Sequence, residues 1–501
     1  MERDTGQSIV EATDGGGHDD AAVPFTWRPT VPETQGIDSR HLTRALRALH
    51  DDGIALHSLI IVRNGDVVLE VYAPPYDRNT LHNVKSVSKS IMSALVGVAL
   101  REGLLTGLDQ TVHQAFPEYI ADDTDPRKKS ITLRHLLTMT SGLDLDENGP
   151  IWDGIVSSDD WIKAALDRPM SADPGERFLY STALTHIVSG ILSRASGRRM
   201  LKLCRDHLFD PLGIGEVQWR QDPQGYDFGG AELFMRPRDM AAFGLLYLNG
   251  GRWNGRQIVP AAWVEESTGN QMQGVDADDR YGYWWWRDLT GDIGYRASGW
   301  GGQHIVVLPG LNMVVAANFG DPNGLRRFFE GFDVSRIGSE TLPPNPEAAR
   351  ELQALVSTIQ HPEPTSVPEL PPLTRDVTGR AYQMDGTDRT SPYDAITFDF
   401  DRSDRAWITL ATKDGSHRLA IGLDGLYRST ASGLFGRMPC DNRIALRGRW
   451  TDDSTFTMDW IDVGDPNHAR LVFSFCDDEI VVDVDVDPAG EHVMLRGSCG
   501  P

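Results

Sequence analysis

The chain has 501 residues, a formal net charge of −24 and 40% hydrophobic residues. This length predicts more than one domain, with enough apolar side chains to fill sizeable cores. The acidic balance argues against nucleic acid and anionic membrane surfaces as partners, because both are bound through clusters of basic side chains.

The N-terminal segment is acidic and rich in glycine, and it lacks the basic and apolar regions of a signal peptide. We expect a disordered tail over residues 1–25. The longest apolar run, 91–100, is too short to cross a bilayer. The four cysteines include no C-x-x-C pair, which indicates neither a redox motif nor a cysteine zinc site, and pairing among them is left open. These features predict a cytoplasmic protein without membrane contact.

Two strands are the first elements predicted in the chain. Residues 58–72 read SLIIVRNGDVVLEVY, in which two apolar, β-branched runs flank Asn64-Gly65. Asn-Gly accepts the positive φ angles of a tight turn, so this segment predicts a β-hairpin. Apolar residues then recur at helical spacing after Ser86, which predicts a helix that begins there. Helical patterns with long loops follow, and two further strands are expected after them.

A change of composition divides the rest of the chain. A helical pattern leads into the Pro-rich stretch HPEPTSVPELPPL, which is typical of a linker. Beyond it, short segments alternate apolar and polar residues between turn signals, the pattern of an all-β module. We therefore predict a first domain over 26–360, a linker over 361–375 and a C-terminal β-barrel-like domain over 376–501.

The stretch VKSVSKS is the strongest local candidate for catalysis. Only seven of the 48 basic residues are lysines, and one of them, Lys89, follows Ser86 by three positions. This spacing puts both side chains on one helix face, where a neutral lysine can take the proton of a serine nucleophile. The unperturbed lysine pKa is about 10.4, so burial and the nearby helix N-terminus must lower it. The alternative is a capped helix with an exposed lysine, because Ser-x-x-Lys also arises by chance.

Two further motifs follow in order. PGERFLYST is a turn that carries Tyr180 just before a helix, and SGWGGQ leads into a strand. Together with Ser86 and Lys89, these motifs resemble the serine β-lactamase and penicillin-binding superfamily. The resemblance is strongest to the branch that contains class C β-lactamases, family VIII esterases, nylon-oligomer hydrolases and D-aminopeptidases. The phrases HLLTMTSGLD and GWGGQ are also typical of that branch, and the resemblance covers roughly residues 25–360.

The resemblance implies an α+β fold: an antiparallel sheet flanked by helices, with an inserted helical subdomain and the active site between them. It implies Ser86 as the nucleophile, Lys89 and Tyr180 as proton-transfer groups, and the backbone N–H groups of Ser86 and Gln303 as the oxyanion hole. The residues implied in substrate binding are Trp300, Gly301, Gly302 and Thr182. Downstream, ALRGRWTDDSTFTMDW resembles the lipocalin-like extension that some members carry.

Two positions depart from the family pattern. The second motif usually reads Tyr-x-Asn, but here Thr182 replaces the asparagine, which puts a side-chain amide for the substrate in doubt. The third motif begins with lysine in β-lactamases, and Trp300 stands at that place. This exchange is expected to alter substrate recognition more than bond cleavage, and Arg296 or His304 lie close enough in sequence to restore a positive charge. A Trp300 packed in the core and a buried, non-catalytic Tyr180 are the alternative interpretations.

The sequence therefore predicts a serine hydrolase that cleaves carboxylic esters or amides through an acyl-enzyme. We expect a small-molecule ester, amide or short peptide as its substrate and no cofactor or metal, and self-association into a homo-oligomer is left open. No G-x-S-x-G occurs, so an α/β-hydrolase nucleophile is disfavoured. Two alternatives are a D-aminopeptidase or β-lactamase-like amide hydrolase, and a protein that binds peptidoglycan fragments without turnover.

Overall fold

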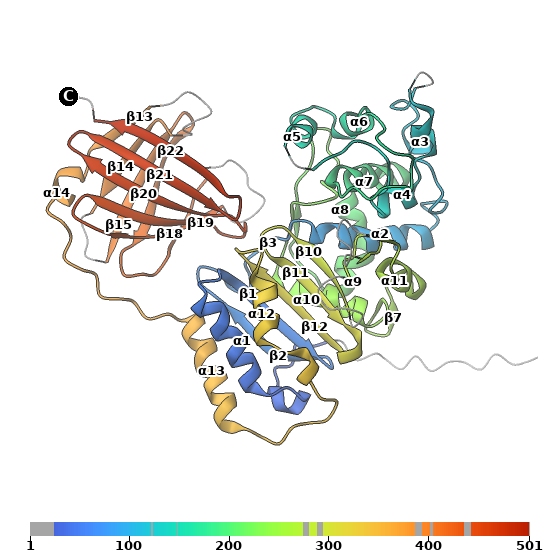
Figure 1. Ribbon diagram of the computed structural model, residues 1–501, viewed down its shortest axis with the longest axis horizontal. Helices are drawn as coiled ribbons and strands as arrows, with labels where there is room; N and C mark the ends of the chain where they lie inside the picture. The colour runs from blue at the N-terminus through green and yellow to red at the C-terminus, as the bar shows by residue number, and fades with distance from the viewer. Residues whose placement is uncertain are drawn as a thin grey trace, which may run out of the picture.

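Two bodies make up the molecule, an α+β domain and a β-barrel joined by one extended segment (Figure 1). The computed structural model describes residues 25–121, 124–147, 149–273, 280–287, 294–385, 393–400, 404–434 and 442–499. All but one residue of the predicted tail, and also Cys440, lie outside these ranges. The three cysteines within them, Cys204, Cys476 and Cys499, are free thiols.

A five-stranded antiparallel sheet forms the centre of the α+β domain, in the order β10-β11-β12-β1-β2. Its strands are β1 (Leu56–Arg63), β2 (Asp66–Tyr72), β10 (Tyr295–Gly299), β11 (Gln303–Leu308) and β12 (Met313–Phe319). The predicted hairpin is confirmed, because Asn64 and Gly65 form the turn between β1 and β2 with φ angles of 50° and 83°. The pairing of β1 with β12 brings both ends of this domain's sequence together.

Helices cover both faces of this sheet (Figure 1). On one face pack α1 (Ser39–Asp51), α12 (Gly324–Gly331) and α13 (Pro346–Gln360). On the other face pack α2 (Val87–Arg101) and α10 (Pro237–Leu248). Successive side chains of a strand point to opposite faces, so a sheet covered on both sides needs strands that are apolar throughout. The predicted antiparallel sheet with flanking helices is confirmed.

A helical subdomain is inserted between the first two strands of the sheet and the last three. Its helices are α3 (Val112–Ala115), α4 (Leu133–Leu137), α5 (Pro150–Val156), α6 (Trp161–Leu166), α7 (Thr182–Ser196), α8 (Met200–Cys204) and α9 (Asp210–Leu212). Further elements of the insertion are α11 (Ala261–Thr268), β3 (His82–Asn83), β4 (Gln218–Trp219), β5 (Leu233–Met235), β6 (Arg252–Trp253), β7 (Arg256–Gln257), β8 (Met272–Gln273) and β9 (Arg280–Tyr281). α2 touches α7 of this subdomain and β10 of the sheet, so the start of α2 lies at their boundary.

The C-terminal body is a β-barrel, which confirms the predicted all-β module. Its antiparallel order β16-β15-β14-β13-β22-β21-β20-β19-β18 closes through a short parallel pairing of β16 with β18, and β17 adds to β18. The elements are α14 (Thr374–Val377), β13 (Ala381–Asp385), β14 (Ala395–Asp399), β15 (Arg405–Thr412), β16 (Gly415–Gly422), β17 (Arg428–Ala431), β18 (Arg443–Trp450), β19 (Thr455–Asp462), β20 (His468–Cys476), β21 (Glu479–Asp487) and β22 (Glu491–Ser498). Its likeness to lipocalins stays a prediction.

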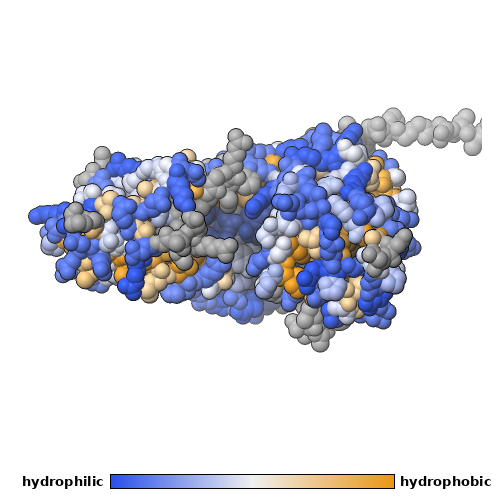
Figure 2. All heavy atoms as spheres, turned by 90° about the horizontal axis from the view of Figure 1, so that it is seen from above, coloured by the Kyte–Doolittle hydropathy of each residue, from blue (hydrophilic) through white to orange (hydrophobic). Residues whose placement is uncertain are grey.

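The two bodies contact each other through an apolar cluster in which Tyr76 packs against Ala445, Ile461 and Val463 of the barrel. A cavity of about 590 Å³ lies beside this cluster, between α1, α13 and the barrel. The face of the molecule in Figure 2 is hollowed between the two bodies, and the floor of the hollow is hydrophilic. Among the helices that the structure describes, none combines the length and the apolar character needed to cross a membrane.

Candidate active site

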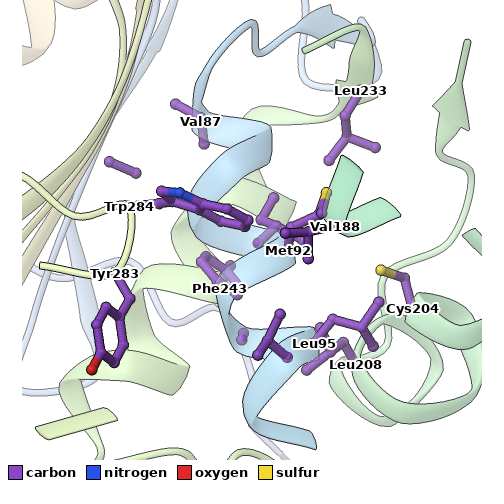
Figure 3. Close-up of a cluster of buried hydrophobic side chains, with 14 of the residues drawn as sticks. Val87, Met92, Leu95, Val188, Cys204, Leu208, Leu233, Phe243, Tyr283 and Trp284 are labelled. Atoms are coloured by element: carbon purple, nitrogen blue, oxygen red, sulfur yellow. The ribbon is translucent and has the colours of Figure 1, made fainter. Parts of the chain in front are cut away.

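Ser86 is the N-cap residue of α2, a helix whose residues from Val87 to Ala99 are all buried. Figure 3 shows side chains of this helix among those of neighbouring elements, including Phe243 and Leu208. A helix packed on all sides by the domain core has little freedom to shift. The fold therefore holds the partly exposed Ser86 in a fixed position at the positive end of the helix.

The other two serines of VKSVSKS have structural partners. Ser88 Oγ donates a hydrogen bond to the carbonyl of Lys85 at 2.6 Å, and Ser90 Oγ donates to the carbonyl of Trp284 at 2.6 Å. Both side chains are buried. Ser86 is thus the serine of this motif that remains for chemistry.

Lys89 donates three hydrogen bonds beside the catalytic candidate Ser86. Its Nζ donates to Ser86 Oγ at 2.8 Å, to Thr182 Oγ1 at 2.9 Å and to the carbonyl of Gly230 at 2.9 Å. Burial lowers the pKa of Lys89 from 10.5 to about 8, although the charge of Glu147 opposes this shift. A sizeable fraction of this lysine is therefore neutral near pH 8, and a neutral amine can accept the Ser86 proton.

Thr182 and Glu147 hold the Lys89 amine in place. Thr182 Oγ1 accepts the hydrogen bond from Lys89 and donates to one Glu147 oxygen, while the other Glu147 oxygen accepts from Thr182 N at 2.9 Å. The N-cap residue of α7, Ser181, makes no side-chain cap, so Glu147 caps this helix from a neighbouring loop. The Thr182 hydroxyl, which we expected in substrate binding, is engaged by Lys89 and Glu147 in this structure.

The Tyr180 ring lies beside Lys89, with its centroid 5.0 Å from Lys89 Nζ, and it stacks on Trp286 with the ring centroids 5.7 Å apart. Burial raises the pKa of Tyr180 well above its ordinary value, although the Ser86 hydroxyl and the charge of Arg296 lower it. This phenol therefore keeps its proton at physiological pH. Tyr180 can donate or relay a proton there, but it does not act as a resident phenolate.

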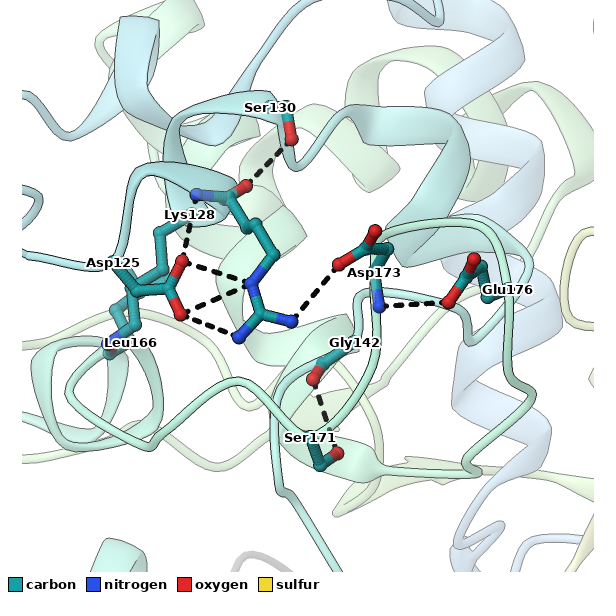
Figure 4. Close-up of polar contacts among 9 residues, drawn as sticks. Asp125, Lys128, Ser130, Gly142, Leu166, Ser171, Asp173 and Glu176 are labelled. Carbon is teal, nitrogen blue, oxygen red and sulfur yellow. Dashed lines mark hydrogen bonds and ion pairs between the residues drawn. The ribbon is translucent and has the colours of Figure 1, made fainter.

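Two neighbouring loops fix the turn that carries Tyr180. The backbone N–H of Leu179 donates to the carbonyl of Met139 at 2.8 Å. Farther back in the turn, the Arg127 guanidinium binds Asp173 at 3.0 Å, within the polar network drawn in Figure 4. The position of Tyr180 is thus set by backbone contacts and supported by surface charges, whose separate contributions are small.

The third motif forms the facing wall and lies close to the chain before Ser86. A Cβ atom on Gly299 would lie 2.3 Å from the carbonyl oxygen of Val84. Gly302 has a φ of 93°, and a Cβ there would lie 2.4 Å from the carbonyl oxygen of Asp321. Both positions need glycine, because a side chain on Gly299 would collide with the chain before Ser86 and one on Gly302 would collide with the backbone at Asp321.

Other residues of the third motif have distinct environments. The Gln303 side chain is buried and donates to the carbonyl of Phe319 at 2.8 Å, so it is structural. Trp300 is 46% exposed and is not packed in the core. Burial lowers the pKa of His304 well below its ordinary value, so this histidine is neutral and cannot replace the missing lysine. Arg296 lies near enough for its charge to lower the Tyr180 pKa.

The fold brings the predicted residues Ser86, Lys89 and Tyr180 together and adds three that sequence reasoning did not identify: Glu147, Lys85 and Asp465. Glu147 and Asp465 lie in no motif, and only the fold brings them here. Lys85 carried a signal, since it is one of seven lysines and directly precedes Ser86. Within the described residues, no group of three or more His, Cys, Asp or Glu side chains is arranged to hold a metal ion.

Comparison with known proteins gives matches over the α+β domain. Residues 42–332 match the family model described as Beta-lactamase. A 6-aminohexanoate-dimer hydrolase from Paenarthrobacter ureafaciens is 23% identical over 312 residues, which are 56% of this chain and 78% of that protein. Esterase EstB from Burkholderia gladioli is 27% identical over 212 residues, 36% of this chain and 53% of that protein.

Solved structures show the same fold at low identity. A Bacillus anthracis protein classed provisionally as a 6-aminohexanoate-dimer hydrolase aligns with a TM-score of 0.54 and 21% identity, over 64% of this chain and 89% of that one. EstCE1, described as a hydrolase with promiscuous acyltransferase activity, aligns with a TM-score of 0.50 and 18% identity, over 59% of this chain and 99% of that one.

Proposed function

Since the chain belongs to the Beta-lactamase family, we propose that it is a serine hydrolase that cleaves carboxylic esters or amides through an acyl-enzyme on Ser86. The observation that carries this proposal is the 2.8 Å contact from Lys89 Nζ to Ser86 Oγ, made by a lysine whose pKa is lowered to about 8. The esterase and amide hydrolase among its relatives support the same class of reaction.

In the first step, Ser86 Oγ bonds to the substrate carbonyl carbon while its proton passes to neutral Lys89. The carbonyl oxygen becomes an oxyanion, for which we propose the backbone N–H groups of Ser86 and Gln303 as donors. The helix N-terminus at Ser86 favours the same negative charge. The buried surroundings of Lys89 favour its neutral form, so burial prepares the base before substrate binds.

In the second step, the bond from the carbonyl carbon to the leaving group breaks. The leaving oxygen or nitrogen takes a proton from the Tyr180 hydroxyl, which takes one in turn from Lys89. Water then attacks the acyl-enzyme and gives its proton through the same pair, so that Ser86 regains its hydrogen and the acid is released. The protonated state of Tyr180 supports this relay role.

Short acyl esters are the substrates that we propose first. In β-lactamases, lysine at the place of Trp300 helps to anchor a substrate carboxylate. A charged hydrogen bond of this kind contributes about 1.5–3 kcal/mol, which is roughly tenfold to a hundredfold in affinity. A short ester needs no such anchor, so the exchange for Trp300 affects it least. The cytoplasmic location and a homo-oligomeric state stay predictions.

The test is a panel of p-nitrophenyl esters, short amides and nitrocefin, with intact-mass analysis of the protein after brief exposure to each. We expect turnover of a short ester, an acyl adduct on the wild-type chain, and a loss of at least about a thousandfold in kcat/KM for Ser86→Ala. Ser88→Ala is the matched control and should keep most of the activity.

Other outcomes identify the alternatives. Loss of activity in Ser88→Ala but not in Ser86→Ala would show that the nucleophile is misassigned. Hydrolysis of nitrocefin faster than every short ester would assign the protein to the β-lactamases. Hydrolysis restricted to amides of amino-terminal D-residues would indicate a D-aminopeptidase, and a Ser86 adduct without product release would indicate a binding protein.

A further inference from the structure

A loop of the barrel reaches the segment that precedes the nucleophile. This loop, 463–467, connects β19 with β20. Its Gly464 carbonyl accepts a hydrogen bond from the Asn83 backbone N–H at 2.7 Å. The Asp465 carboxylate accepts from the Asn83 side chain at 3.1 Å and from Lys85 Nζ at 2.9 Å. The C-terminal body thus contacts Asn83 and Lys85, one and three positions after His82, where β3 begins; Lys85 directly precedes Ser86.

The barrel also packs on the opposite wall of the site. Gly301 adopts a φ of 75°, and a Cβ atom there would lie 2.6 Å from Pro466 and 3.5 Å from Pro488. Pro466 follows Asp465 in the same loop, and Pro488 lies between β21 and β22. The barrel therefore touches both chain segments that border Ser86, and its docking fixes the distance between them.

The contact neutralises a cation. Lys85 Nζ lies 2.9 Å from Asp465 and 3.5 Å from Glu232, and the exposed fractions of these three side chains are 16%, 8% and 18%. Burial opposes the charged form, but Asp465 and Glu232 raise the pKa of Lys85 overall, so the ammonium is retained. Two carboxylates thus pair with the Lys85 ammonium. Without them, this ammonium would bind an anion strongly, because charges attract each other more in a largely buried environment than in water.

This ammonium lies where the substrate is expected. Lys85 Nζ is 5.9 Å from the centroid of the exposed Trp300 ring, and Trp300 stands at the place of the carboxylate-binding lysine of β-lactamases. A positive charge is therefore present beside this wall, but Asp465 holds it. A substrate carboxylate would have to displace Asp465 to reach it.

We propose that Asp465, supplied by the barrel, sets the substrate preference of the site, because by holding Lys85 it makes neutral acyl groups better substrates than acyl groups that carry a carboxylate. The proposal rests on the proposed function and names the substrate class for it. Asp465 acts through Lys85, so it is a positioning residue and not a catalytic one.

The test compares two esters that differ only in charge: p-nitrophenyl hexanoate and the mono-p-nitrophenyl ester of hexanedioic acid. The quantity measured is kcat/KM for the acidic ester divided by kcat/KM for the neutral one, after subtraction of the rate with Ser86→Ala. In Asp465→Asn the Lys85 ammonium loses its nearer carboxylate and keeps only the longer contact with Glu232, so this ratio should rise about tenfold or more, the value of one charged hydrogen bond.

Asp424→Asn is the matched control. Asp424 pairs with Arg428 at 2.8 Å inside the barrel, and its side chain makes no contact with Lys85. Loss of this ion pair weakens the barrel without freeing Lys85, so the ratio should stay within about twofold of wild type. A rise in the ratio equal to that of Asp465→Asn would overturn the proposal, because it would show that a loosened barrel alone changes the substrate preference.

A double variant separates charge from structure. Asp465→Asn with Lys85→Met removes the freed ammonium, so the ratio should return to the wild-type value or below it. A ratio that stays high would show that Lys85 is not the cation, and it would overturn the proposal. An unchanged ratio in folded Asp465→Asn would overturn it as well.

Glu232→Gln provides a second route if Asp465→Asn does not fold. Glu232 belongs to the α+β domain and makes the longer contact with Lys85, so the ratio should rise in the same direction by about threefold. No rise would contradict the proposal. Failure of the proposed function is a separate result, since it would appear as hydrolysis of both esters that persists in Ser86→Ala.

Discussion

The helix α2 and the C-terminal barrel place charged groups in opposite ways. Lys89 of α2 is 1% exposed and has three polar partners, and burial lowers its pKa to about 8. On β21 of the barrel, Asp483 and Asp485 alternate with valines along the strand, so both carboxylates lie on its solvent-exposed side. They pair with His492 and raise its pKa. The barrel charges face water and pair with each other there, whereas the charge on Lys89 is enclosed by a core that favours its reactive neutral form.

The difference shows that the two bodies of the chain contribute different groups to the site. The α+β domain prepares the reactive groups because its core surrounds α2. The barrel loop that carries Asp465 departs from the exposed pattern of β21, since the Asp465 side chain is 8% exposed and lies against the other body. The barrel thus contributes a buried carboxylate to the border of the site, and the contrast between the two bodies can be tested in order of expected effect.

The largest effect should come from removal of the buried base. Lys89→Ala is expected to lower kcat/KM for a short ester by about a thousandfold or more, because nucleophile and base act as one unit. Lys128→Ala is the matched control: Lys128 is also buried in the α+β domain and donates to the carbonyl of Leu166 at 2.6 Å (Figure 4). Equal losses in both variants would mean that the measurement reports folding and not the base.

Removal of the hydroxyl that positions this base should have a smaller effect. Thr182→Val deletes an acceptor of Lys89 and a donor to Glu147, so kcat/KM should fall about tenfold to a hundredfold. Thr185→Val is the control on the same helix, because its hydroxyl donates to the carbonyl of Thr182 at 2.6 Å and does not touch Lys89. Wild-type activity in Thr182→Val would show that Lys89 is held by its other partners.

The pH profile should show the buried base as well. Lys89 has a pKa of about 8 and is active when neutral. kcat/KM should therefore rise about tenfold per pH unit below pH 8 and level off above it. Tyr180 keeps its proton throughout this range, so no second rise is expected from it. A flat profile between pH 5 and 9 would contradict a titrating lysine base.

The smallest effect concerns stability in acid. Burial lowers the pKa of His82 from 6.5 to about 3. Above pH 6.5 this histidine is neutral in both states and has no effect; as the pH falls from 6.5 toward 3, only the unfolded chain takes up the proton. The free energy of unfolding should then decrease by about 1.4 kcal/mol per pH unit from this group.

Two variants check this sign by thermal unfolding between pH 7 and 4. His82→Gln should flatten the loss of stability in acid. His492→Gln should not, because Asp485 raises the pKa of this exposed barrel histidine, and its small contribution is present at low pH and lost as the pH rises through the folded pKa. The same acid slope in both variants would contradict the assigned difference between the two bodies.

Local chemistry made part of the fold predictable. Asn64-Gly65 specifies its turn, and the apolar spacing after Ser86 specifies a buried helix, because each signal is contained in a few neighbouring residues. The strand β10 was not predicted as an element of its own, since its sequence YRASG has no apolar run. The closure of the barrel through β16 and β18 depends on pairing across the body and leaves no local signal.

The candidate site divides in the same way. The spacing of Ser86 and Lys89 has a chemical reason, and Tyr180 lies in a motif that resembles the second motif of the family, so sequence reasoning could name all three. Glu147 and Asp465 are single acids in an acidic chain, and their roles arise from tertiary contacts with Thr182 and Lys85. The charge that remains near Trp300 could not be judged from sequence either, because His304 is neutral only through its burial.

The contact between Lys85 and Asp465 joins residues 380 positions apart, so the two residues are synthesised at different times. Domains fold in order as a chain leaves the ribosome at about 5–20 residues per second. Asp465 is therefore synthesised about 7 to 27 seconds after residue 332, where the match to the family model ends. Ser86, Lys89 and all the partners of Lys89 are already synthesised by then. A nascent chain can therefore become reactive before it becomes selective. Its preference for neutral acyl groups is established only after the last strands of the barrel are synthesised and the barrel docks.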